Sequence, residues 1–129
     1  MNMNVRYVRW LTMLAFVVGG AAPVAMIALA GVPPVRIAIE SGAPYFLPRA
    51  AIVTSSAIPI RWENTTGTTH TITHEACDAG TGCMFDSGLV LPDGSYELPG
   101  LPPGDYAYFC RVHPIMRGIL AVKDPETPS

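Results

Sequence analysis

The stretch Cys110-Arg111-Val112-His113-Pro114-Ile115-Met116 places a thiol, an imidazole and a thioether within one short turn. His70, which lies 110 − 70 = 40 residues before Cys110, offers a second imidazole. A cysteine thiolate and two histidines in one plane, with a methionine sulfur bound weakly along the axis, are the ligands of a mononuclear type 1 copper site. We therefore expect His70, Cys110, His113 and Met116 to bind one copper ion.

The spacing of these ligands favours a metal site over unrelated structural roles. A single buried cysteine is often inert, and a methionine at the end of a strand usually packs in a core. The order C-x₂-H-x₂-M, however, lets one turn wrap around an ion, with Pro114 stiffening the turn. A soft thiolate and two imidazoles suit both Cu(II) and Cu(I), so the same ligands predict one-electron transfer.

The chain from Val35 onward alternates short β-rich segments with glycine, proline, asparagine and aspartate. Short strands at near-regular spacing, together with thirteen prolines and twelve glycines, indicate an all-β sandwich or a small barrel with no helix. Five aromatic residues are expected in its core: Phe46, Trp62, Phe85, Tyr106 and Tyr108. The strands are expected at 35–40, 51–53, 58–63, 69–73, 85–91, 96–98, 106–109 and 118–122.

Residues from about Val35 to Lys123 resemble the cupredoxins, and the amicyanin and plastocyanin branch in particular. The resemblance rests on four stretches in this order: 60–64 followed by His70, 85–88, 104–110, and the ligand loop 110–118. It implies a Greek-key β-sandwich with copper near one end, and passage of electrons through the exposed edge of His113. Thr71 stands where many relatives have an asparagine that ties the two ligand loops together, so its hydroxyl is the candidate for that tie.

The N-terminus predicts export. The segment from Trp10 to Val32 carries no charge and follows Arg6 and Arg9. We interpret residues 1–30 as a signal peptide, cut after Ala30, or as a membrane anchor through residues 10–32 that stays attached. The cupredoxin-like domain then comprises residues 31–129. It is expected in the periplasm or on the outer face of the cytoplasmic membrane.

The other two cysteines fit an oxidising compartment. Cys77 and Cys83 have five residues between them and are expected to form a disulfide. The alternative is a second metal site formed by His74, Cys77 and Cys83. His74 otherwise has a structural or surface role.

The leading functional hypothesis is single-electron transfer between exported redox proteins, with a c-type cytochrome or a dehydrogenase as donor or acceptor. The alternative is copper storage or delivery. An enzyme is not expected, because four protein ligands fill the site and the sequence shows no second metal motif. Without Arg6 and Arg9, 8 − 2 = 6 basic residues face ten acidic ones, a net charge of −4 that argues against a nucleic-acid partner.

Overall fold

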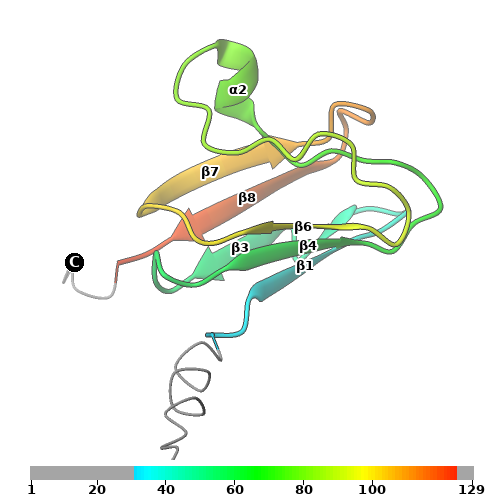
Figure 1. The fold of residues 1–129 in the computed structure, drawn as a ribbon. Helices are drawn as coiled ribbons and strands as arrows, with labels where there is room; N and C mark the ends of the chain where they lie inside the picture. Colours follow the sequence, from blue (N-terminus) through cyan, green and yellow to red (C-terminus); the bar gives the residue numbers. More distant parts are fainter. Residues whose placement is uncertain (1–30, 125–129) are drawn as a thin grey trace, which may run out of the picture. The chain divides into compact units, whose positions relative to one another are not determined.

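A computed structural model describes residues 31–124; the expected signal or anchor segment, residues 1–30, and the tail 125–129 lie outside the described residues. Two four-stranded sheets face each other, which confirms the expected all-β sandwich (Figure 1). Each sheet is mixed, because β1 runs parallel to β4 and β3 runs parallel to β8. The first sheet has the order β2 (Phe46–Leu47), β1 (Val35–Ile39), β4 (Ile60–Asn64), β6 (Ser95–Leu98). The second has the order β3 (Ala50–Val53), β8 (Arg117–Val122), β7 (Gly104–Phe109), β5 (Thr73–His74).

Alternating burial along the strands builds the core between the sheets. In β4, Ile60, Trp62 and Asn64 are buried, while the two residues between them are half-buried. Successive side chains of a strand point to opposite faces, so this pattern places one face of β4 against the other sheet. The Trp62 ring lies 5.6 Å from Tyr108 and 5.9 Å from Phe85, measured between centroids. All five aromatic residues predicted for the core are buried.

The prediction of a strand at 85–91 is wrong. This segment forms only two isolated bridges, Thr73 with Asp86 and His70 with Val90. Gly88 has φ +62°, and the Ser87 hydroxyl accepts the backbone N–H of Ile72 at 2.8 Å. The Ser87 hydroxyl therefore takes the place of a backbone carbonyl as the hydrogen-bond acceptor for Ile72. The strand expected at 69–73 is likewise reduced to β5, which leaves the chain around His70 free of a regular sheet pattern.

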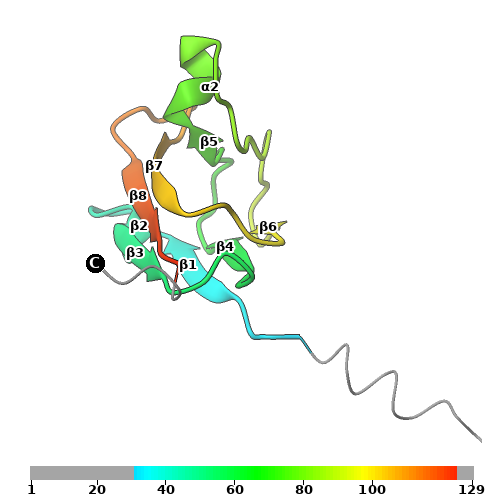
Figure 2. The same cartoon turned by 90° about the vertical axis from the view of Figure 1, so that its left-hand side faces the viewer.

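The expectation of no helix is also wrong, because a short helix, α2 (Glu75–Ala79), follows β5. It ends at Gly80, whose φ of +80° is left-handed. None of its residues is buried and no side chain caps its N-terminus. Such a helix has no apolar periodicity for sequence analysis to detect. It projects from the end of the second sheet (Figure 2).

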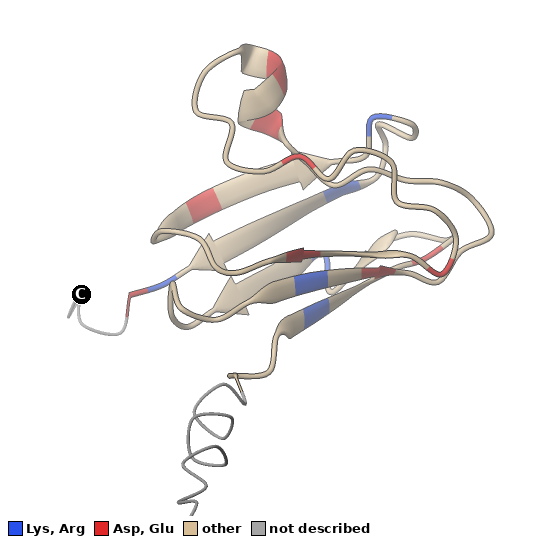
Figure 3. Ribbon diagram, viewed as in Figure 1, with Lys and Arg blue, Asp and Glu red and all other residues tan. Residues whose placement is uncertain are grey.

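Charged residues are spread over both sheets and α2, with no basic stripe in the part of the chain that is drawn in colour (Figure 3). Among residues 31–124, we find no helix of the length and apolar character needed to span a bilayer.

Candidate metal centre

The loop between β7 and β8 carries three of the four predicted ligands. Cys110 directly follows β7, and β8 begins directly after Met116. The Cys110 N–H donates to the Met116 carbonyl at 3.1 Å, and the Met116 N–H donates to the His113 carbonyl at 2.9 Å. These two backbone hydrogen bonds close the turn, so that the thiol, imidazole and thioether are held at one end of the sandwich.

Three donor atoms form a compact triangle. The Cys110 Sγ lies 3.8 Å from His70 Nδ1 and 3.9 Å from His113 Nδ1, and the two Nδ1 atoms lie 3.2 Å apart. Metal bonds to nitrogen and sulfur of roughly 2.0–2.3 Å bring two donors of one ion to within about 4.5 Å of each other. The triangle therefore fits one ion. In the described part of the chain, this is the one cluster of three or more His, Cys, Asp or Glu side chains with metal-binding spacing.

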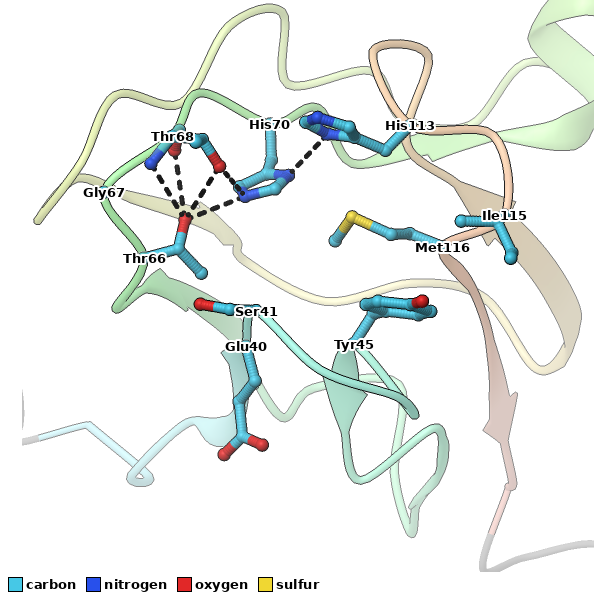
Figure 4. A pocket seen from close by; sticks show the side chains of 10 residues that line it. All are labelled: Glu40, Ser41, Tyr45, Thr66, Gly67, Thr68, His70, His113, Ile115 and Met116. Carbon is cyan, nitrogen blue, oxygen red and sulfur yellow. Dashed lines mark hydrogen bonds between the residues drawn. The ribbon is translucent and has the colours of Figure 1, made fainter.

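Met116, the fourth predicted ligand, lies beside the two histidines. Its side chain reaches toward the two imidazoles from the β8 side of the loop (Figure 4). Met116 is 2% exposed and lines a cavity of about 330 Å³ together with His70 and His113. The structure thus brings all four predicted ligands together at one place. His70, Cys110 and Met116 are buried, whereas His113 is partly exposed.

His70 is held by contacts that sequence analysis missed. Its Nε2 lies 2.8 Å from Thr66 Oγ1 and 2.9 Å from Thr68 Oγ1, as Figure 4 shows. Burial lowers the pKa of His70, and the nearby His113 lowers it further. A lower pKa favours neutral imidazole, which is the form that binds metal.

Thr71 joins the two ligand segments in two ways. Its hydroxyl accepts the Arg111 N–H at 2.8 Å, which confirms the expected tie. Its own backbone N–H points at the Cys110 sulfur at 3.3 Å, a contact that sequence analysis did not anticipate. Hydrogen bonding to the thiolate is one of the controls on the potential of a type 1 copper.

The two remaining cysteines form the expected disulfide, Cys77–Cys83. The second metal site with His74 is therefore excluded, because neither sulfur is free to bind an ion. His74 has a structural role: its ring stacks on Phe85 at 5.3 Å, and its Nδ1 accepts the Met84 N–H at 3.3 Å.

Several solved structures share this fold. A purple cupredoxin from Nitrosopumilus maritimus has 22% identity and a TM-score of 0.59, over 69% of this chain and 99% of that one. The Cu(I) form of a point mutant of amicyanin has 21% identity and a TM-score of 0.61, over 74% of this chain and 88% of amicyanin. A copper-containing nitrite reductase from Thermus scotoductus has 21% identity and a TM-score of 0.60, over 71% of this chain but only 23% of the enzyme.

No protein-family model and no curated protein sequence matches the chain. The structural likeness establishes the cupredoxin fold. Within that fold, the thiolate, the two imidazoles and the thioether have the arrangement of a type 1 site, which suits one copper ion.

Proposed function

We propose that this protein, which has the cupredoxin fold, carries single electrons between redox proteins through one type 1 copper. The observation that carries the proposal is the triangle of Cys110 Sγ and the Nδ1 atoms of His70 and His113, with sides of 3.2–3.9 Å. When bound, copper supplies a one-electron couple between Cu(II) and Cu(I).

The protein holds its ligands in place. Cys110, His70 and Met116 are each no more than 3% exposed. Two backbone hydrogen bonds close the loop, and Thr71 links it to the segment that carries His70. Ligands held in this way change position little between the two oxidation states. A small rearrangement favours fast electron transfer.

His113 is the ligand closest to solvent, which supports it as the point of electron entry and exit. Its neighbours in the loop are exposed and apolar: Val112 is 48% and Ile115 73% exposed. Ile115 also lines a shallow depression with Pro44, on the chain before β2. A small apolar surface of this kind suits a brief, weak encounter with a protein partner. A c-type cytochrome or a dehydrogenase is the partner that we propose.

An exported location is part of the proposal. The Cys77–Cys83 disulfide supports it, because disulfides persist mainly in oxidising compartments. The apolar segment within residues 10–32 supports it as an export signal or membrane anchor.

We propose a carrier and not an enzyme. The match to nitrite reductase covers less than a quarter of that protein. His70, Cys110 and His113 lie at metal-binding spacing and Met116 lines the same cavity, so four protein side chains are available to one ion. Sustained nitrite or oxygen reduction by the purified protein would overturn this part of the proposal.

The test is a visible spectrum of the copper-loaded, oxidised protein. Strong absorption from sulfur-to-copper charge transfer is expected, and Cys110→Ser should abolish it. Wild-type protein that stays colourless would refute the site. Repeated reduction and reoxidation without copper loss would support the carrier. Release of copper to a chelator or acceptor on each reduction would instead support storage or delivery.

A further inference from the structure

The side-chain amide of Asn64 has one defined orientation. Asn64 is 1% exposed, and its Nδ2 lies 2.8 Å from the Thr68 carbonyl and 3.1 Å from the Val90 carbonyl. Carbonyl oxygens only accept hydrogen bonds, so the NH₂ group must face them. Oδ1 of Asn64 then faces Thr66, and it accepts the Thr66 backbone N–H at 3.0 Å and the Thr66 hydroxyl at 2.7 Å.

The orientation of Asn64 determines what the Thr66 hydroxyl offers to His70. A hydroxyl has one proton to donate. Asn64 Oδ1, at 2.7 Å, is the nearest acceptor for the Thr66 hydroxyl, whereas the Thr68 carbonyl at 3.1 Å and the Thr68 hydroxyl at 3.3 Å lie farther away. The Thr66 hydroxyl therefore presents a lone pair to His70 Nε2, which lies 2.8 Å away. That contact is a hydrogen bond only if Nε2 carries the ring proton.

The Thr68 hydroxyl also contacts His70 Nε2, but it does not determine which ring nitrogen of His70 carries the proton. Its oxygen lies 2.9 Å from His70 Nε2 and 3.3 Å from Thr66 Oγ1. Among residues 31–124, the other hydrogen-bonding group within its reach is Thr66 Oγ1, and either oxygen of that pair could be the donor. The Thr68 hydroxyl is thus able to accept from a protonated Nε2 or to donate to a bare one.

We propose that Thr66 is a positioning residue that sets the tautomer of His70, with the proton on Nε2 and the lone pair of Nδ1 directed at Cys110 and His113. The tautomer is set before any metal arrives, so that no proton has to move within the ring when an ion binds. Metal-binding histidines commonly donate their second ring N–H to a neighbouring group, which orients the ring. The inference rests on the proposed function only in that His70 serves as a ligand.

The experiment is a long-range ¹H–¹⁵N correlation spectrum of the metal-free protein, which identifies the ring nitrogen that carries the proton. It is recorded above the ordinary imidazole pKa of about 6.5, so that His70 is neutral. We expect a single Nε2–H form in the wild type and in Thr68→Val. Thr66→Val should show the Nδ1–H form as well, because the Thr68 hydroxyl is then free to donate to Nε2. Thr66→Ser keeps the hydroxyl and should restore the single form.

A second measurement is the affinity for copper. Loss of a hydrogen bond to a ligand typically weakens metal binding by about 10- to 100-fold, and we expect a loss of that order in Thr66→Val. Thr69→Val, in the same segment, is the control for loss of a hydroxyl that is not hydrogen-bonded to His70, and it should bind like the wild type.

Two outcomes would overturn the inference: a wild-type His70 with its proton on Nδ1, or a Thr66→Val variant that keeps only the Nε2–H form. These outcomes are separate from the fate of the proposed function. A wild-type protein with the expected tautomer that still binds no copper would refute the copper site and leave the role of Thr66 intact.

Discussion

The hydroxyl of Thr71 accepts a hydrogen bond from the backbone N–H of Arg111 at 2.8 Å. This bond joins the residue after His70 to the residue after Cys110. The two ligand segments are therefore connected by the protein itself as well as through a shared metal. A second bond, from the Thr71 N–H to the Cys110 sulfur at 3.3 Å, makes the same connection at the thiol.

Thr71→Val should destabilise the metal-free protein. Valine has nearly the shape of threonine but leaves the Arg111 N–H, a partly buried group, without its acceptor. A fully buried group that loses its partner costs about 1–3 kcal/mol, so we expect a loss near the lower end of that range, about 1 kcal/mol. Urea unfolding of the metal-free protein measures the effect. Thr71→Ser retains the hydroxyl and should unfold close to the wild type. Equal stability of Thr71→Val and wild type would contradict the structural importance of the tie.

Met116→Leu should raise the reduction potential and leave copper bound. The thioether donates electron density that favours Cu(II), so its removal favours Cu(I). Leucine conserves the volume of methionine, and such exchanges usually cost less than about 1.5 kcal/mol in stability. Voltammetry of the two proteins under identical conditions is the measurement. An unchanged potential would show that Met116 is not an axial ligand.

Arg111→Gln should raise the pKa of Asp86. Burial of the Asp86 carboxyl acts to raise its pKa, but hydrogen bonds from Arg111 and from the Gly88 N–H outweigh burial and lower it. A lowered pKa means that this carboxylate stabilises the fold above the unfolded value of about 3.9, and that the contribution is lost as the pH falls through the folded pKa.

The measurement for Arg111→Gln is an NMR titration of the side-chain carboxyl groups. Arg61→Gln is the matched control, because Arg61 pairs with Glu63 and Glu97 and not with Asp86. An Asp86 pKa that stays equally low in Arg111→Gln would mean that Arg111 does not control it.

Replacement of both Cys77 and Cys83 by serine should lower the free energy of unfolding by about 2 kcal/mol, because the disulfide closes only a short loop. Neither sulfur belongs to the metal centre, so the visible spectrum of the copper form should not change. Chemical unfolding of the oxidised wild type and the double variant, with the thiol-reduced wild type as a third sample, measures the effect. A bleached copper spectrum in the double variant would contradict the separation of the two sites.

The hydrophobic pattern was sufficient to predict most strands and the core, but local geometry required the structure. Strands β1, β4 and β8 have the alternation of one buried face, and that alternation is visible in the sequence. The two-residue strand β2 and the helix α2 are too short to show a period. In the segment 85–91, β-prone residues form bridges instead of a strand, because the Ser87 hydroxyl takes a place in the ladder.

The ligand chemistry could be predicted from the residues alone: a thiolate, two imidazoles and a thioether at a spacing that suits copper, on an all-β chain. This was possible because ligand type and the spacing within the 110–116 loop are local properties. The folded structure was needed to show how Asn64 and Thr66 orient His70, and which N–H reaches the sulfur of Cys110. The contact to the sulfur joins segments 39 residues apart, so no local pattern encodes it. The contacts of Asn64, Thr66 and His70 lie close together in sequence, but their hydrogen-bond directions follow from how Asn64 is buried against the carbonyls of Thr68 and Val90, and this burial is a property of the folded chain.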